Sequence, residues 1–162
     1  LRYFNPVGSH PSHLIGDDPT IKKTTNLMPA IIKVVKGIEK SFEVFGDDYD
    51  TPDGSGIRDY IHIMDLATAH VHAVDFLNKK NIFEVFNIGT GYGISVFQFL
   101  KCFEEVCGLK VPFNVSSRRS GDPSCCYADP TKAEKILNWK AKRDLKEMCL
   151  SAWNFSYSCE II

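Results

Sequence analysis

Short runs of alternating apolar and polar residues predict several strands, each bounded by Gly, Pro or Asp. The run after Gly56 is the clearest, because Tyr60 and His62 alternate with Ile61 and Ile63 and would point to opposite faces of a strand. Similar β-prone runs predict strands at residues 1–4, 42–45, 83–88 and 111–115, with a turn at residues 5–8.

Apolar residues spaced three or four apart predict helices between these strands. One helix is expected to begin near Thr25 or Asn26 and to end at Gly37, with Pro29 tolerated in its first turn. A second is expected over residues 66–78, capped by Asp65. Local signals predict three more, from Ser95 with Gln98 to Gly108, from Asp129-Pro130, and from Asp144 with Glu147. The alternation of strands and helices indicates an α/β fold.

Composition restricts the partners of this fold. The 162 residues carry 19 basic and 20 acidic side chains without a basic run, which argues against nucleic acid or an anionic membrane as the main partner. No apolar run approaches the roughly 18 residues of a spanning helix, and the start at Leu1 has no signal-peptide pattern. The six cysteines lack zinc or redox spacing and are interpreted as reduced thiols. We therefore expect a soluble, cytoplasmic protein.

Two arginines on loops rich in Gly and Pro are the main candidates for ligand binding. Arg58 follows Gly54 and Gly56, which leave room for a ligand to approach the backbone. A second arginine loop occupies residues 118–123. Because guanidinium groups suit phosphate oxygens, the pair suggests a ligand with two phosphates. Phe45 offers a surface for stacking a flat base, although it is equally compatible with a place in the core.

Other motifs are weaker candidates. The loop at residues 89–93 follows a predicted strand and precedes a helix, as in a dinucleotide site, but it lacks the final small residue and the later acidic residue of that motif. The acidic loop at residues 46–56 fails the EF-hand pattern at its Gly and Glu positions. His10 and His13 have no further ligands nearby. No metal site is predicted.

Six motifs together resemble the UDP-glucose 4-epimerase family of extended short-chain dehydrogenases. They are LRYFNPVG, NLMP, VFGDDYDTPDGSGIRDYIH, FNIGTG, RRSGD and CYADP, and they lie in register over nearly the whole chain. The resemblance is to the later half of that Rossmann-type enzyme. It implies that residues 1–162 form the nucleotide-sugar-binding C-terminal portion, a small mixed sheet with packed helices. It also implies that the N-terminal dinucleotide-binding domain is absent from this chain.

The resemblance also implies roles for particular residues. Tyr3 and Phe4 would lie between the nicotinamide of NAD and the sugar. Cys126 stands where some members have tyrosine, and its small side chain implies room for the N-acetylated sugars UDP-GlcNAc and UDP-GalNAc. The other implied substrate contacts are Asn5, Asn26 and Leu27 for sugar and diphosphate; Glu43 and Phe45 for uracil; Arg58 and Arg119 for diphosphate; Asp122 for ribose; and Val44 and Tyr60, to which no part of the substrate is assigned.

The implied activity is that of an isomerase of galactose metabolism. The family interconverts UDP-galactose and UDP-glucose by transient oxidation at C4 with bound NAD, using a tyrosine base and a lysine four residues later. No tyrosine in this sequence has a lysine at that spacing, so no catalytic residue is assigned and the chain alone is expected to be inactive. NAD would be held mainly by the missing half, through which the full-length protein would form a homodimer that this fragment would not form. A non-catalytic UDP-sugar-binding module and another nucleotide-sugar enzyme of the superfamily remain the alternatives.

Overall fold

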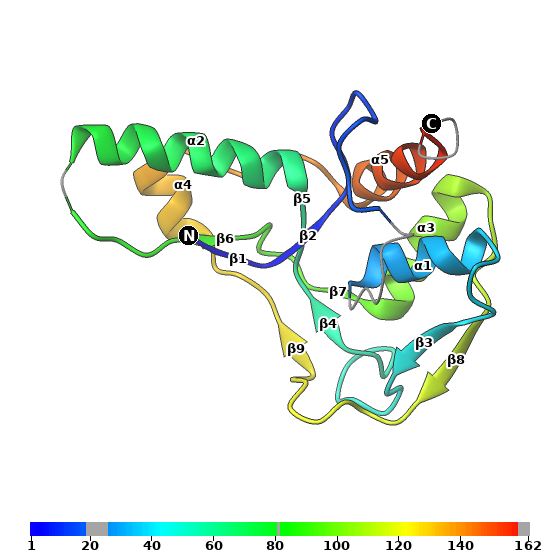
Figure 1. The fold of residues 1–162 in the computed structure, drawn as a ribbon. Helices are drawn as coiled ribbons and strands as arrows, with labels where there is room; N and C mark the ends of the chain where they lie inside the picture. Colours follow the sequence, from blue (N-terminus) through cyan, green and yellow to red (C-terminus); the bar gives the residue numbers. More distant parts are fainter. Residues whose placement is uncertain (19–25, 81, 159–162) are drawn as a thin grey trace.

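The computed structural model describes residues 1–18, 26–80 and 82–158 (Figure 1). The expected helix start at Thr25, and Cys159, therefore lie outside the described residues. The helices are α1 (Leu27–Val35), α2 (Ile63–Lys79), α3 (Val96–Cys107), α4 (Thr131–Leu137) and α5 (Leu145–Ser158). The strands are β1 (Arg2–Tyr3), β2 (Asn5–Val7), β3 (Phe42–Phe45), β4 (Ile57–Arg58), β5 (Tyr60–His62), β6 (Asn87–Ile88), β7 (Ile94–Ser95), β8 (Phe113–Ser116) and β9 (Cys125–Cys126).

The strands pair in four small sheets. Three are parallel pairs, β1 with β6, β2 with β5 and β3 with β8. The fourth is mixed, because β4 pairs antiparallel with β7 on one side and parallel with β9 on the other. Together with the five helices, these sheets confirm the predicted α/β fold with small mixed sheets.

A larger core lies between α1, α3, α5 and β3. The largest fully buried side chains there include Phe99 and Phe103 on α3 and Ile31 on α1. Phe103 meets Trp153 of α5 edge to face, with ring centroids 6.1 Å apart. Burial of these aliphatic and aromatic faces holds the three helices together, because each fully buried large side chain contributes roughly 1.5–3 kcal/mol.

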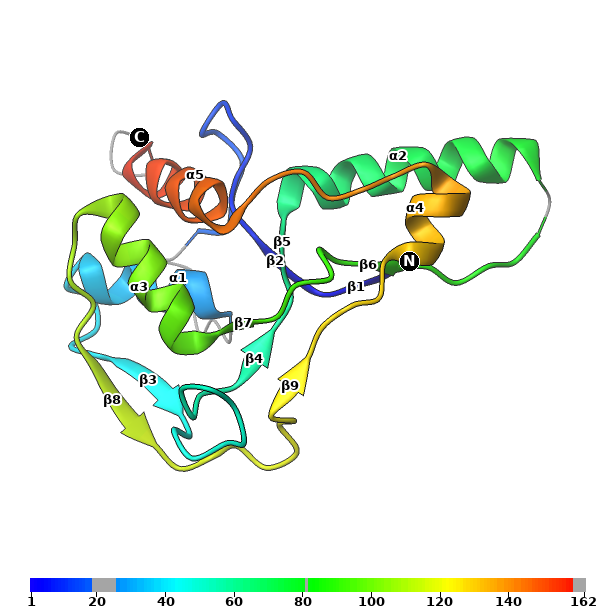
Figure 2. The same cartoon turned by 180° about the vertical axis from the view of Figure 1, so that it is seen from behind.

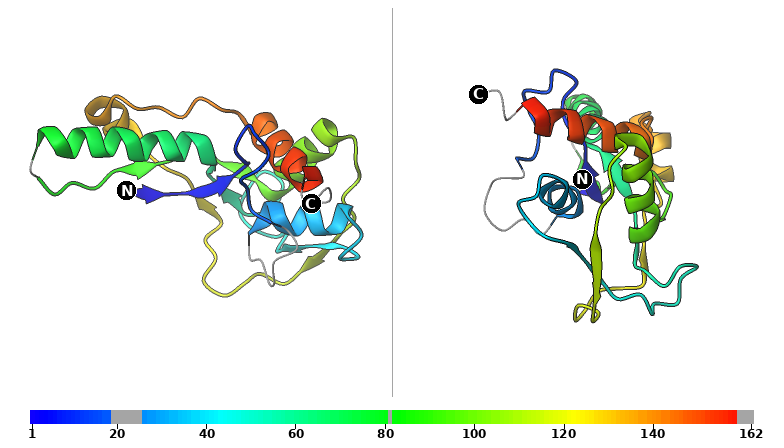
Figure 3. Two further views of the ribbon diagram at one scale, coloured as in Figure 1. Left: turned by 45° about the horizontal axis from the view of Figure 1, so that its top comes forward. Right: turned by 90° about the vertical axis from the view of Figure 1, so that its right-hand side faces the viewer.

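A smaller core lies beneath α2, on the side where the chain begins. It joins Leu66 and Ala69 of α2 to Ile88 of β6 and to Leu137 and Trp139 at the end of α4. Figure 3 shows α2 reaching away from the group formed by α1, α3 and α5. Seen from behind, the connection from α4 to α5 runs along α2 (Figure 2). The molecule therefore has two packed regions joined through β2, β5 and this connection.

Several predicted boundaries differ from the structure. Residues 5–7 form strand β2 rather than part of a turn, because Asn5 to Val7 pair with Tyr60 to His62. The strand expected over 83–88 is reduced to β6, and Phe83 is 92% exposed. The strand expected over 111–115 is shifted to β8. Helix α2 begins at Ile63 and is capped by His62 rather than Asp65.

Candidate functional site

One open cleft gathers most of the predicted binding residues. It has a volume of about 710 Å³ and lies where the start of α1, strands β3, β4 and β5 and the loop after β8 converge. The predicted residues that line it are Asn5, Asn26, Leu27, Glu43, Val44, Phe45, Arg58, Tyr60, Arg119 and Asp122. Three predicted residues, Tyr3, Phe4 and Cys126, are not in its lining.

Two guanidinium groups meet around one carboxylate in this cleft. Arg119 Nε donates to Asp122 Oδ2 at 2.9 Å, and Arg58 Nη2 lies 3.7 Å from Asp122 Oδ1. Arg58 Nη1 also donates to the carbonyl oxygens of Ile57 at 2.7 Å and Pro123 at 2.8 Å. These contacts fix the orientation of Arg58 while both cations remain in the cleft lining, and paired guanidinium groups are suited to bind a diphosphate.

The β3 wall carries an aromatic surface and an acceptor. Phe45 is 40% exposed, and the guanidinium carbon of Arg119 lies 4.8 Å from the centre of its ring. Glu43 accepts hydrogen bonds from Ser116 Oγ and from Asn114 Nδ2, and these bonds lower the pKa of its carboxyl group. Glu43 is therefore held ionised beside an exposed ring, an arrangement suited to a flat heterocycle with N–H donors.

Tyr60 forms the apolar floor of the cleft. Its ring packs 4.7 Å from that of Phe99. Burial raises the pKa of the Tyr60 hydroxyl to about 12, so the phenol stays neutral at physiological pH and is available as a donor.

Asn26 and Leu27 stand at the first turn of α1. The Asn26 side chain makes no capping hydrogen bond to the helix, and its Nδ2 lies 3.4 Å from Asp17 Oδ2. Asn26 is therefore the N-cap residue of α1 by its position, but its side chain does not supply the cap. The amide lies in the cleft lining, next to the helix end where backbone N–H groups favour anions.

The remaining three predicted residues lie outside the cleft lining. Tyr3 of β1 is 56% exposed, and its ring centroid lies 6.4 Å from that of His70. Phe4 follows it and donates its backbone N–H to Ile88 O at 3.1 Å. Cys126 is exposed on β9, where it pairs with Arg58.

Sequence reasoning missed Asp59, which is completely buried and lies in the chain between two residues of the cleft lining, Arg58 and Tyr60. Its carboxylate accepts hydrogen bonds from the backbone of Thr90 and Gly91 in the loop at residues 89–93. That loop therefore binds an internal carboxylate with its amides, which explains its dinucleotide-like glycines. The available signal was its position in the sequence. Asp59 is an acidic residue between two predicted ligand-binding residues, Arg58 and Tyr60, in a predicted extended segment.

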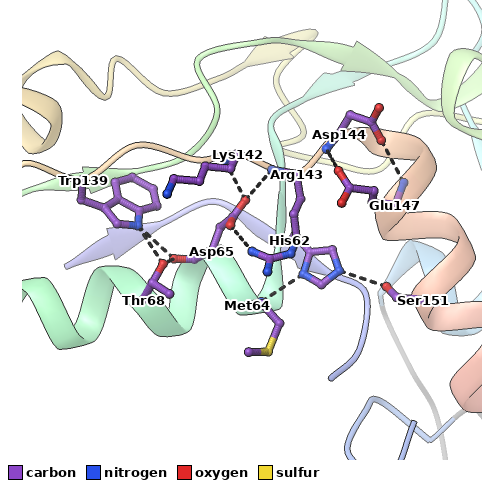
Figure 4. Close-up of polar contacts among 10 residues, drawn as sticks. All are labelled: His62, Met64, Asp65, Thr68, Trp139, Lys142, Arg143, Asp144, Glu147 and Ser151. Carbon is purple, nitrogen blue, oxygen red and sulfur yellow. Dashed lines mark hydrogen bonds and ion pairs between the residues drawn. The ribbon is translucent and has the colours of Figure 1, made fainter. Parts of the chain in front are cut away.

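A second buried polar cluster lies outside the cleft, at the junction of α2 and α5 (Figure 4). Asp65 accepts hydrogen bonds from the backbone N–H groups of Lys142 at 2.9 Å and Arg143 at 2.8 Å, and its carboxylate pairs with the Arg143 guanidinium at 2.5 Å. Asp65 is thus occupied by the α4–α5 connection, which is why it does not cap α2.

His62 completes this second cluster. Its Nδ1 accepts from the Met64 N–H at 3.1 Å, and its Nε2 lies 3.0 Å from Ser151 Oγ on α5. Because Nδ1 accepts, Nε2 carries the proton and donates to Ser151 in the neutral ring. Burial, with a contribution from the nearby Arg143 cation, lowers the pKa of His62.

Metal-binding and membrane-spanning features concern residues 1–18, 26–80 and 82–158, the part of the chain that the structure describes. Within it, no group of three or more His, Cys, Asp or Glu side chains is placed to hold a metal ion. No helix among the same residues is long and apolar enough to cross a membrane. The cysteines at 102, 107, 125, 126 and 149 are free thiols.

Comparison with known proteins gives consistent matches. Residues 2–151 match the family described as GDP-mannose 4,6 dehydratase. UDP-glucose 4-epimerase from Bifidobacterium longum is 49% identical over 155 residues, which cover 96% of this chain and 45% of that protein. The Drosophila melanogaster UDP-glucose 4-epimerase is 50% identical over 157 residues, again 96% of this chain and 45% of the relative.

Solved structures agree in fold. The UDP-glucose 4-epimerase of Stenotrophomonas maltophila, with bound NAD and formylated UDP-arabinopyranose, superposes with a TM-score of 0.95 at 45% identity, covering 99% of this chain and 48% of that one. The B. longum enzyme in complex with NAD⁺ and UDP gives a TM-score of 0.88 at 46% identity, covering 98% and 47%. The chain thus spans somewhat less than half the length of the relatives it matches, and it aligns to their C-terminal half.

Proposed function

The chain belongs to the family described as GDP-mannose 4,6 dehydratase, and from that premise we propose that it is the nucleotide-sugar-binding portion of a UDP-glucose 4-epimerase. The observation that carries this proposal is the convergence of Arg58, Arg119 and Phe45 on one cleft. Two cations and an exposed ring match the diphosphate and the base of a UDP-sugar. The reaction assigned to the whole protein is the interconversion of UDP-galactose and UDP-glucose.

Within that proposal, each wall of the cleft has a distinct task. Arg58 and Arg119 would neutralise the diphosphate, and Asp122, which orients both, would accept from a ribose hydroxyl. Phe45 would stack on the uracil while Glu43 and the backbone around Val44 receive its polar edge. Asn5, Asn26, Leu27 and Tyr60 of the cleft lining would face the sugar, together with Tyr3, Phe4 and Cys126 from outside the lining.

The residues at the start of the chain are compatible with a nicotinamide nearby. Tyr3 exposes 56% of its surface, and β1 pairs only with β6 among the described strands, so its other edge is open. We propose that Tyr3 and Phe4 border the nicotinamide of NAD. When bound, NAD would supply the hydride acceptor and donor for C4. The residues of this chain would hold the UDP-sugar so that C4 faces that ring.

The open edge of β1 also supports a domain arrangement. Helix α2 exposes Val71, Val74 and Leu77, which are 61%, 56% and 56% exposed. An open strand edge and an apolar helix face are surfaces that proteins normally cover. We propose that residues 1–162 are the C-terminal portion and that a dinucleotide-binding half carrying the Tyr-x-x-x-Lys pair completes the enzyme. Its intact mass in the native source would be about twice the 18.2 kDa of this chain.

The proposal extends to partners and location. We propose a cytoplasmic homodimer that assembles through the dinucleotide-binding half, without nucleic acid. The nearly balanced charge of 19 basic and 20 acidic residues supports the last point. Size-exclusion chromatography with light scattering on the intact protein and on these 162 residues tests it. A dimer formed by the 162 residues alone would contradict the assigned contact.

Binding of UDP by the intact protein tests the function directly, and adjacent arginines provide a matched pair. Arg119→Gln removes a cleft cation and should weaken UDP binding by roughly tenfold or more, since a charge-assisted hydrogen bond contributes about 1.5–3 kcal/mol. Arg118→Gln is the control. Arg118 Nε instead donates to Asp48 at 2.7 Å, and its guanidinium stacks 4.3 Å from the Tyr49 ring, outside the cleft lining. Equal binding by both variants and the parent, in isothermal titration calorimetry, would contradict the proposal.

Catalysis and ligand choice need separate tests. The 162 residues alone should give no UDP-galactose turnover, since they lack the Tyr-x-x-x-Lys pair, and turnover would refute this assignment. The family match to GDP-mannose 4,6 dehydratase makes a GDP-sugar the second candidate. Competition of UDP against GDP decides between them, because Glu43 and Phe45 would meet a larger purine in the second case. Competition by UDP-GlcNAc then tests the room that Cys126 provides.

A further inference from the structure

We infer that Asp59 is a positioning residue that aligns the walls of the nucleotide-sugar cleft without touching the ligand, an inference that rests on the proposed function. Asp59 is 0% exposed and is absent from the cleft lining, whereas its chain neighbours Arg58 and Tyr60 both line the cleft. A fully buried carboxylate is uncommon and costly unless its oxygens accept hydrogen bonds. The hydrogen bonds of Asp59 therefore identify the segments that it positions.

The carboxylate binds two separate segments of the chain. Its Oδ1 accepts from the Thr90 backbone N–H at 2.9 Å and from the Thr90 hydroxyl at 2.6 Å. Its Oδ2 accepts from the N–H of Gly91 at 2.9 Å and from that of Ala128 at 3.1 Å. All four donors are uncharged. They tie the loop between β6 and β7, and the segment after β9, to the junction of β4 and β5.

The backbone of Asp59 adds two further connections. Its N–H donates to Cys126 O at 3.2 Å, and its carbonyl oxygen accepts from the Asn5 N–H at 3.0 Å. One residue thus links Asn5 of β2 and Cys126 of β9 to the chain that carries Arg58. The strand segments facing the sugar and the diphosphate are held in register through Asp59.

The loop at residues 89–93 is shaped for this carboxylate. A Cβ atom on Gly89 would lie 2.5 Å from Asp59 Oδ2 and 2.6 Å from the Ala128 Cβ, so no larger residue fits without displacement. Gly91 has a φ of +82°, which L residues with side chains rarely adopt. The glycines therefore let the backbone enclose an anion of the chain itself.

Because all four donors to Asp59 are uncharged, its carboxylate does not pair with Arg58, and that cation stays available for the ligand. Along an extended segment successive side chains point to opposite faces, so Asp59 points inward while Arg58 points into the cleft. The guanidinium group of Arg58 is directed to Pro123 O and Asp122 rather than to its neighbour. The backbone dipoles around Asp59 stabilise its buried charge without a cation, in the way that loop amides bind anions elsewhere.

Asp59→Asn in the intact protein tests the inference against a matched control, Asp65→Asn. Both carboxylates are buried at 0% and 1% exposure and both accept backbone N–H groups, but Asp65 lies in the cluster of Figure 4, outside the cleft lining. We expect both variants to melt at lower temperature. Only Asp59→Asn should weaken UDP binding, by roughly tenfold or more, because displacement of the adjacent Arg58 weakens its charge-assisted contacts with the diphosphate.

A second pair covers the case in which Asp59→Asn does not fold. Thr90→Val removes the hydroxyl donor to Asp59 with little change in shape, whereas Thr90→Ser keeps it. UDP affinity, measured well below the melting temperature of each variant, should fall severalfold in Thr90→Val and stay near that of the parent in Thr90→Ser. Affinity equal to the parent in Asp59→Asn or Thr90→Val, or an equal loss in Asp65→Asn, overturns the inference. A parent protein that fails to bind UDP overturns the proposed function itself, and this inference with it.

Discussion

The β4–β5 junction behind the cleft lining and the α2–α5 junction each contain a buried aspartate, but the two aspartates are stabilised differently. Asp59 has four uncharged donors, three of them backbone N–H groups. Asp65 has two backbone N–H donors and the guanidinium group of Arg143. A buried carboxylate can thus be satisfied by dipoles or by a cation, and the choice follows location. Asp59, whose chain neighbours line the cleft, is held by dipoles, whereas Asp65, outside the cleft lining, is held by an arginine as well.

The largest expected effect comes from breaking the ion pair of the junction. Asp65→Asn should lower the free energy of unfolding by about 3 kcal/mol, because it leaves the Arg143 guanidinium partly buried without its anion. Arg143→Met should cost less, since Asp65 keeps two backbone donors. Urea denaturation of both single variants and the double variant measures the coupling. A loss below about 1 kcal/mol in Asp65→Asn would contradict the assigned importance of this pair.

A side chain that crowds the Asp59 carboxylate should lower the free energy of unfolding somewhat less than Asp65→Asn does. Gly89→Ala places a Cβ 2.5 Å from Asp59 Oδ2, and overpacking of this kind typically costs about 1–3 kcal/mol. Gly37→Ala is the control, since its Cβ meets nothing within 4 Å although its φ of +70° is strained. Thermal melting and UDP titration should show that both variants lose stability and that only Gly89→Ala also loses affinity. A loss of UDP affinity in Gly37→Ala would show that reduced stability alone weakens binding, and would contradict a specific role for the region around Asp59.

A smaller effect is expected from acid. Burial lowers the pKa of His62 in the folded protein below 6.5, its ordinary value. Once the pH falls below 6.5, the unfolded chain therefore binds a proton that the folded protein does not, and unfolding takes up a proton. The free energy of unfolding should therefore decrease as the pH falls from 7 to 5. His62→Asn retains an acceptor for the Met64 N–H but cannot be protonated, so its pH dependence should be flatter over this interval. Parallel pH profiles for the two proteins would show that His62 is not the responsible group.

The smallest effect is expected at an exposed ion pair. Lys101 Nζ lies 3.9 Å from Glu105 Oε1 on the outer face of α3, with side chains 78% and 58% exposed. Lys101→Ala should change the free energy of unfolding by less than about 0.5 kcal/mol, because water and salt screen such pairs. Urea denaturation at low and high salt is the measurement. A loss of unfolding free energy comparable with that of Asp65→Asn would show that burial does not explain why the Asp65 ion pair stabilises more than the Glu105 ion pair.

Elements specified by neighbouring residues could be predicted from the sequence. The capping box of Ser95 and Gln98 is present, and Gly108 ends α3 in the left-handed conformation with a φ of 69°. Strand β3 has the predicted limits, Phe42 to Phe45. In each case the decisive interactions involve residues a few positions apart or a simple alternation along the chain.

The polar clusters could not be predicted, because their partners are distant in sequence. Asp59 binds Thr90, 31 residues away, and Ala128, 69 residues away. Asp65 was expected to cap α2, but it binds Arg143, 78 residues away, and leaves the cap to His62. Local sequence rules do not detect such competition for a side chain.

The candidate site was predicted only in part, because some of its residues act through partners that are distant in sequence. Arg58 and the arginine loop at residues 118–123 stood out from the sequence pattern, and family resemblance selected Arg119 within that loop; Arg58 and Arg119 both line one cleft. The positions of Tyr3, Phe4 and Cys126 rested on family resemblance alone, and these residues lie outside the lining. Their roles stay predictions. Asp59 escaped notice because a residue that acts through hydrogen bonds to other segments has no sequence motif of its own.

The parallel pairing of distant strands has a consequence for how the molecule folds. Glu43 of β3 lies beside Asn114 of β8, 71 residues later in the chain. Parallel strands cannot be joined by a tight hairpin, so a long loop must close before this contact gives any stabilisation. Such topologies fold slowly. During synthesis, the wall of the cleft that carries Phe45 therefore gains its partner strand only after residue 116 has emerged.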